Sequence, residues 1–200
     1  MKITFLKAKK PLVKEITSEE SKPYPLVKNF TSYEEEITID KKGLTKLFRA
    51  MSEAAKQGHC MHKGPLKRPL IDESRALMSD RSAPTQLLVL DIDGLRATPG
   101  DDLQAMADRI VLQLPELFHD CSYIVQASAS LGIKKNSVSL HLFFLMDMLV
   151  HPKTLKDLIR MINYECKFLA EQITLSANGQ SLSCVLDPSV ADNSKLIYLA

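Results

Sequence analysis

The sequence lacks any run of apolar residues close to the roughly 20 that a membrane-spanning helix requires. It also lacks a C-x-x-C pair and a secretory signal, and its cysteines lie far apart, at Cys60, Cys121, Cys166 and Cys184. We therefore expect reduced, mostly buried thiols in a cytoplasmic protein that has no membrane partner.

The chain also has little excess charge. Its formal net charge is +2, so a polyanion partner cannot be inferred from total charge and would have to be recognised by a local cluster of cations. The hydrophobic fraction of 45% and the charged fraction of 25% are ordinary for a globular protein and exclude a wholly disordered chain. A length of 200 residues suits one substantial domain or two small modules that share a core.

The most informative stretch covers residues 86–94, where an apolar strand leads into two carboxylates and then a glycine. Side chains alternate along a strand, so Asp91 and Asp93 are expected on the same face. Two like charges this close are unfavourable unless a cation neutralises them, and carboxylate oxygens suit Mg²⁺ or Mn²⁺. The alternative is that the carboxylates only cap the following loop, as Asp often does in turns.

Apolar periodicity and turn residues predict a strand, helix, strand, strand, helix, strand order for residues 86–199. The predicted segments are strands at 121–128 and 137–145, helices at 103–114 and 152–173, and two final β-like pieces at 182–186 and 195–199. This order predicts an α+β fold that resembles the RRM (RNA-recognition motif), with an antiparallel sheet. Residues 1–85 are expected to form a smaller N-terminal α/β module, whose helix is capped by Asp40.

In an RRM-like sheet the first and third strands are neighbours, which would bring distant polar residues together. Ser139 and His141 on the third strand should then share the face of Asp91 and Asp93. The last strand runs antiparallel to the first, so only its beginning lies beside the acidic end. We therefore expect residues 195–199 to be the fourth strand, with Asp187 in the approach to it, or else a bent strand that places Asp187 in the same way. A straight strand at 182–186 would put Asp187 at its far end.

A basic segment at residues 59–81 is a candidate surface for phosphate or nucleic acid, or else a solvated basic loop. The candidates in it are Lys63, Lys67, Arg68 and Arg75. Its H-C-M-H sequence at 59–62 is followed by no second ligand pair, so structural zinc is not predicted.

Three short motifs resemble those of the archaeo-eukaryotic primase superfamily, the primase-polymerases of cells, plasmids and phages. They are L-D-I-D at residues 90–93, S-L-H at 139–141 and V-L-D at 185–187. The resemblance implies a template-dependent nucleotidyltransferase that synthesises primers on DNA, as in the replication proteins of mobile genetic elements. It further implies an RRM-like catalytic module at 86–200 that packs against the N-terminal module. Because the chain stops within a β-like run, a helicase or other replication module is expected downstream.

The same resemblance implies residue roles. Asp91, Asp93 and Asp187 would hold two Mg²⁺ or Mn²⁺ ions, and Ser139 and His141 would bind the triphosphate of the incoming nucleotide. Lys195 occupies a position where the family usually has Arg, and would also bind nucleotide. The implied partners are nucleoside triphosphates and a single-stranded DNA template.

Two other functions remain open at the level of sequence. A haloacid dehalogenase-type phosphatase would use Asp91 as nucleophile and Asp93 as acid and base, but it should have Thr where this chain has Leu95. A non-catalytic RRM-like module that binds nucleic acid should expose aromatic side chains on its sheet. Here the best strand offers Asp, Ser and His, and the chain has no Trp.

Overall fold

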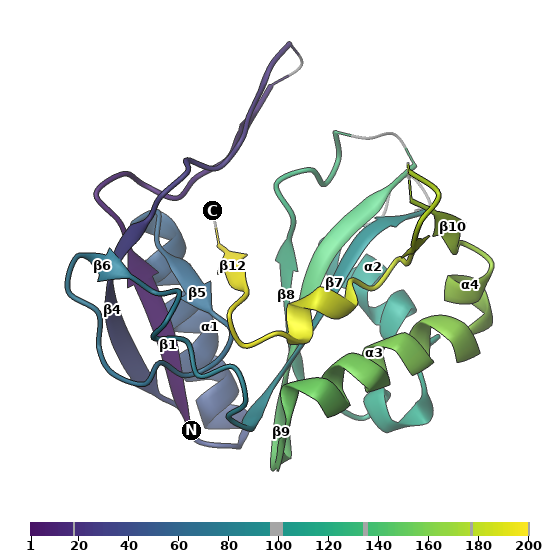
Figure 1. Ribbon diagram of the computed structural model, residues 1–200. Helices are drawn as coiled ribbons and strands as arrows, with labels where there is room; N and C mark the ends of the chain where they lie inside the picture. Colours follow the sequence, from purple (N-terminus) through teal and green to yellow (C-terminus); the bar gives the residue numbers. More distant parts are fainter. Residues whose placement is uncertain (18, 97–101, 134–135, 177, 200) are drawn as a thin grey trace.

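The computed structural model describes residues 1–17, 19–96, 102–133, 136–176 and 178–199. It is a mixed α+β structure with two main antiparallel sheets, which agrees with the predicted fold class at that level. Figure 1 shows the two sheets side by side, with one helix beside the N-terminal sheet and the other helices beside the second sheet. In the described part of the chain, none of the helices combines the length and apolar character needed to cross a membrane.

The N-terminal sheet has the strand order β12-β5-β1-β4-β6. Its strands are β1 (Lys2–Lys7), β4 (Asn29–Glu36), β5 (Cys60–His62), β6 (Glu73–Ser74) and β12 (Leu196–Tyr198). Between β1 and β4 the chain forms a separate two-stranded arm from β2 (Glu15–Ile16) and β3 (Ser21–Lys22), which projects from this sheet in Figure 1.

Helix α1 (Lys41–Lys56) follows β4 and begins where the sequence predicts. The side chain of Asp40 accepts a hydrogen bond from the Gly43 backbone N–H at 2.6 Å, which satisfies one of the free donors of the first turn. Leu47, Met51 and Ala54 recur at helical spacing and are buried. The helix thereby contributes one apolar face to the core.

The second sheet has the order β7-β9-β8, with all pairs antiparallel. It consists of β7 (Thr85–Leu95), β8 (Tyr123–Ala127) and β9 (Val138–Val150). The helical segments that accompany it are α2 (Leu103–Val111), η1 (Glu116–Phe118), α3 (Pro152–Glu165), α4 (Lys167–Ala170) and η2 (Pro188–Ala191). The helix predicted over 152–173 is interrupted at Cys166, whose backbone is extended.

The end of the chain differs from the sequence-based expectation. Residues 185–187, not 195–199, lie beside β7: Leu186 bridges Ile92, and the Asp187 backbone N–H donates to the Asp91 carbonyl at 2.9 Å. β12 instead pairs with β5 in the N-terminal sheet, where Ile197 lies opposite Met61 and is buried. The prediction that residues 195–199 form the fourth strand beside β7 is therefore wrong.

A short hairpin precedes this segment, formed by β10 (Thr174–Leu175) and β11 (Leu182–Ser183). The preference for 195–199 assumed that a strand at 182–186 would run the full length of β7, which would have placed Asp187 at the end of β7 remote from Asp91 and Asp93. The strand-like contact with β7 extends only over 185–187, and it lies at the end of β7 that carries Asp91 and Asp93.

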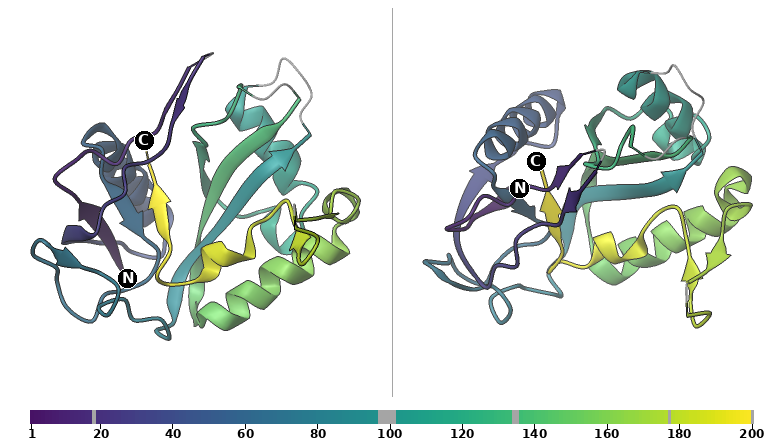
Figure 2. Two further views of the ribbon diagram at one scale, coloured as in Figure 1. Left: turned by 45° about the horizontal axis from the view of Figure 1, so that its top comes forward. Right: turned by 90° about the horizontal axis from the view of Figure 1, so that it is seen from above.

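The two sheets share one hydrophobic core, in which Phe5 and Met61 of the first sheet belong to the same buried cluster as Leu90 and Leu142 of the second. β12 adds a second connection, because it returns the end of the chain to the N-terminal sheet, as all views in Figures 1 and 2 show.

All four cysteines are free thiols, but the expectation that most are buried is wrong. Only Cys60 is buried, and Cys121 is exposed.

Candidate functional site

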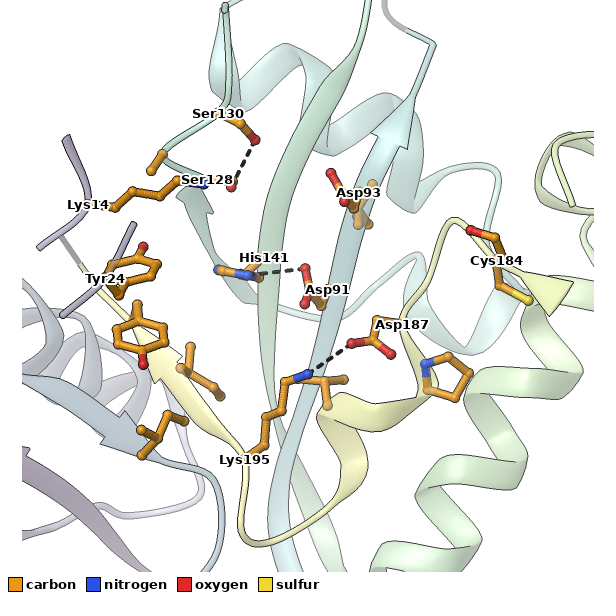
Figure 3. Close-up of a pocket in the computed structure, with 18 of the residues that line it drawn as sticks. Lys14, Tyr24, Asp91, Asp93, Ser128, Ser130, His141, Cys184, Asp187 and Lys195 are labelled. Atoms are coloured by element: carbon orange, nitrogen blue, oxygen red, sulfur yellow. Dashed lines mark hydrogen bonds and ion pairs between the residues drawn. The ribbon is translucent and has the colours of Figure 1, made fainter. Parts of the chain in front are cut away.

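A pocket of about 630 Å³ lies between the two sheets and contains the acidic residues singled out from sequence. Its walls come from β7 and β9, from the 185–187 segment, from β12 and from the arm (Figure 3). The sequence-predicted residues that line it are Asp91, Asp93, His141, Asp187 and Lys195. The volume is within the usual range for small-molecule sites.

Asp91 and His141 lie opposite each other on β7 and β9. The His141 Nε2 atom is 3.2 Å from Asp91 Oδ1, and both side chains are largely shielded from solvent. On the other side of the ring, His141 Nδ1 is 3.2 Å from the Oε1 atom of Gln126 on β8. Gln126 in turn donates from Nε2 to the Tyr198 carbonyl at 3.0 Å, so the chain of contacts connects the two sheets.

This chain of hydrogen bonds fixes the tautomer of His141. A backbone carbonyl can only accept, so the amide nitrogen of Gln126 faces Tyr198 and its oxygen faces His141. Nδ1 must therefore carry a proton. With Nδ1 protonated, a neutral ring would present an unprotonated Nε2 to the Asp91 carboxylate, so this contact is attractive only for the imidazolium form or with a cation shared between the two groups.

Ser139 holds Asp93. The buried Ser139 hydroxyl donates to Asp93 Oδ1 at 2.7 Å and accepts from the Gly94 backbone N–H at 3.2 Å. Gly94 has a φ of +78°, a conformation that a residue with a side chain adopts only with strain, and it lies near the end of β7 where the register with β9 shifts between Ile92 and Leu95. Ser139 thus orients the carboxylate as the chain leaves the sheet.

Asp187 has a cation beside it. Its carboxylate accepts from the Ser189 backbone N–H at 2.8 Å and lies 3.1 Å from Lys195 Nζ, which also donates to the Ser189 hydroxyl at 2.6 Å. Burial acts to raise the pKa of the Asp187 carboxyl, but the hydrogen bonds from Ser189 and the Lys195 charge outweigh it and the pKa is lowered. Asp187 is therefore ionised and available to a cation at neutral pH.

The donor set suits a hard divalent cation. Three carboxylates line one pocket, and Asp91 and Asp187 sit on backbone segments joined by a 2.9 Å hydrogen bond. In their present orientations, however, the carboxylates face Lys195, Ser139 and His141. Among the described residues no group of at least three His, Cys, Asp or Glu side chains is arranged to hold a metal. Metal binding at Asp187 would thus require the carboxylate to exchange the Lys195 ammonium group for the metal.

The four basic residues predicted to bind phosphate do not line this pocket. Lys63 is buried at 3% exposure and donates to the Leu87 carbonyl at 2.8 Å, and burial lowers the pKa of its amine to about 8. It lies where the β7–β9 register shifts between Thr85 and Leu87. Lys63 is therefore a contact between the two sheets and is not positioned to contact a polyanion.

The other three basic residues lie nearer the surface. Arg68 forms a salt bridge with Glu73, Arg75 donates to the Ser194 carbonyl, and Lys67 is exposed. Arg75 thereby secures the turn before β12, whereas Lys67 and Arg68 are exposed. Their assignment to phosphate or template contact stays a prediction.

Several pocket residues were missed by sequence reasoning. They are Lys14 and Tyr24 beside the arm strands, Ser128 just after β8, and Tyr198 on β12. Gln126 on β8, which contacts His141 without lining the pocket, was missed too. Gln126 could have been found, because the predicted strands at 121–128 and 137–145 would pair it with His141 in the observed register. The arm and β12 carried no such signal, since nothing local places them beside β7.

Comparison of the chain with models of protein families, with curated proteins and with solved structures gave no match. The chemistry of the site is therefore the basis for its interpretation.

Proposed function

We propose that the protein is a template-dependent nucleotidyltransferase that synthesises primers on DNA, a primase-polymerase, and that the pocket is its active site. The single observation that carries the proposal is the convergence of residues from all three motifs in one pocket. Asp91, His141 and Asp187 line its wall, and Asp93 is held there by Ser139.

The proposal includes an RRM-like catalytic module at residues 86–200 on an N-terminal α/β module at 1–85. It is supported by the spatial order of residues 185–187, β7, β9 and β8, in which neighbours run antiparallel. It is also supported by the helices α2 and α3, which follow β7 and β9 in sequence. The module departs from a simple RRM-like arrangement at β12, which joins the other sheet.

Asp91, Asp93 and Asp187 would hold Mg²⁺ or Mn²⁺, which when bound makes a 3′-hydroxyl more acidic and balances charge on the pyrophosphate. The remaining chemistry is positioning and electrostatics, and needs no covalent nucleophile on the protein. As an imidazolium, His141 would donate from Nε2 to a phosphate oxygen while Nδ1 donates to Gln126. Lys195, released from Asp187, would be a second cation for the triphosphate.

Neither alternative function gains a specific observation. The phosphatase hypothesis requires Asp91 to attack phosphorus, yet Asp91 Oδ1 already lies 3.2 Å from His141 Nε2. The pocket does contain aromatic side chains, but beside three carboxylates and a histidine, which a simple nucleic-acid-binding surface does not need.

The direct test is primer synthesis on single-stranded DNA with nucleoside triphosphates and Mg²⁺ or Mn²⁺. The double variant Asp91→Ala/Asp93→Ala should reduce product by at least about 100-fold, the usual cost of removing a group that stabilises transition-state charge. Asp157→Ala is a matched control, because Asp157 is exposed on α3 outside the pocket. Equal product from the wild type and the double variant would refute the proposed site.

A further inference from the structure

Two tyrosines stack at the end of the pocket remote from Asp187. Tyr24 comes from the arm and Tyr198 from β12, and their ring centroids are 3.6 Å apart with planes inclined by 11°. Figure 3 shows Tyr24 across the pocket from Asp91 and Asp187, with His141 between them. The pocket therefore has an aromatic end and a charged end.

The stack itself is an unusual one. Aromatic pairs in proteins favour offset or edge-on geometry with centroids about 4.5–7 Å apart, because two ring faces carry the same partial charge. The Tyr24–Tyr198 pair is nearly face to face, with centroids 3.6 Å apart, and so lacks the favoured geometry. A flat, electron-poor ring would stack on either tyrosine more favourably than the tyrosines stack on each other.

Tyr24 can leave this stack without breaking either main sheet. The arm strands β2 and β3 pair only with each other among the described residues. Tyr198, by contrast, is held by β12 pairing with β5 and by the hydrogen bond from Gln126 to its carbonyl. One ring is thus fixed to the scaffold, and the other lies in the irregular segment directly after β3 of the arm.

We propose that Tyr24 and Tyr198 form a nucleobase subsite: a purine or pyrimidine ring stacks on Tyr198, and Tyr24 closes over it from the arm. This inference rests on the proposed function, because it takes the occupant to be the nucleotide whose phosphates lie at the charged end. Base stacking on an aromatic side chain tolerates every base, which suits a template-dependent enzyme.

A free nucleotide fits the pocket better than a template base. One continuous hollow of about 630 Å³ joins the tyrosines to the carboxylates, and a volume of this size holds one small molecule. A nucleotide likewise has a flat apolar ring at one end and phosphates at the other. Lys14, from the same arm as Tyr24, also lines the pocket and brings a positive charge to it.

The test compares two ligands, a nucleoside triphosphate and inorganic tripolyphosphate, by calorimetric titration of the intact chain with Mn²⁺ present. Tyr24→Ala should weaken binding of the nucleoside triphosphate by about 5- to 150-fold, the range that loss of one stacking partner gives. Affinity for tripolyphosphate should be unchanged, and Tyr24→Phe should bind both ligands as the wild type does. Tyr164→Ala is the matched control, since Tyr164 is exposed on α3 outside the pocket.

Each other outcome is decisive. If Tyr24→Ala binds the nucleoside triphosphate as tightly as the wild type, or loses both ligands equally, the subsite is refuted and the proposed function is not. Wild-type protein that binds tripolyphosphate as tightly as the nucleotide would refute it in the same way. In a third titration, with a single-stranded oligonucleotide, a loss confined to that ligand would assign the tyrosines to the template and refute the nucleotide subsite. Wild-type protein that binds none of these ligands would refute the proposed function itself.

Discussion

At the scale of single residues, the site is defined by what each polar group can donate or accept. The Tyr198 carbonyl can only accept, so the Gln126 amide nitrogen donates to it and the Gln126 oxygen accepts the proton of His141 Nδ1. His141 thus presents Nε2 to Asp91 and to the pocket. Gln126 acts through His141, so it is a positioning residue.

Gln126→Leu should remove the hydrogen bond that keeps the proton of the neutral His141 ring on Nδ1. In the wild type we expect nitrogen NMR of the neutral His141 ring to show the proton on Nδ1, and in the variant a shift towards Nε2. Primer synthesis should fall by about 10- to 100-fold, as for other groups that orient a functional histidine. Ser122→Ala, an exposed change just before β8, is the control. Wild-type protein with the proton on Nε2 would contradict the assignment.

At the scale of elements, local signals predicted most strands and helices. The Asp40 cap and the apolar spacing of α1, the apolar run of β7 and the proline at the start of α3 each act within a few residues of chain. The long-range neighbours of β12 were not predictable in this way. Two segments, 182–186 and 195–199, were both β-like in sequence, and which one contributes the neighbour of β7 depends on core packing against β5.

Helix α1 provides a test of such packing. Gly43 lies in its first turn, where alanine normally favours a helix over glycine by about 1 kcal/mol. Here an added Cβ would lie 1.8 Å from the Thr38 carbonyl oxygen, a backbone atom that cannot rotate away. Gly43→Ala should therefore destabilise the protein by about 1–3 kcal/mol in urea unfolding. Lys42→Ala changes the exposed neighbour and should alter stability little. A Gly43→Ala variant more stable than the wild type would contradict the close approach of Thr38 to position 43.

At the scale of the whole molecule, one core and a few polar contacts join the two sheets. Most of the candidate site could be predicted because Asp91, Asp93 and His141 lie on β7 and β9, whose pairing follows from their order. Asp187 was also expected there, although the segment that pairs with β7 was not the one predicted. The tyrosines could not be predicted, since the arm and β12 reach the pocket only when the N-terminal sheet packs against the second one. Lys63 is buried at this junction for the same reason.

Lys63 predicts a pH dependence of stability. Its amine has a pKa of about 8 in the folded protein and an ordinary value of 10.5, so between these values the unfolded chain binds more protons. The unfolding free energy of the wild type should therefore rise with pH across this window, by on the order of 3 kcal/mol relative to Lys63→Met. Urea unfolding of both proteins from about pH 7.5 to about pH 10.5, which spans the folded and ordinary pKa values of Lys63, measures the difference. A constant difference would mean that the amine is not buried.

The central claim is that Asp91, Asp93 and Asp187 bind the divalent metal at which nucleotides react. Anomalous diffraction from crystals of the protein grown with Mn²⁺ and a non-hydrolysable nucleoside triphosphate tests it most directly. We predict a manganese peak in contact with the carboxylates of Asp91 and Asp187, with Lys195 turned away from Asp187. Bound nucleotide with manganese elsewhere, and with the Asp187–Lys195 ion pair intact, would contradict the account.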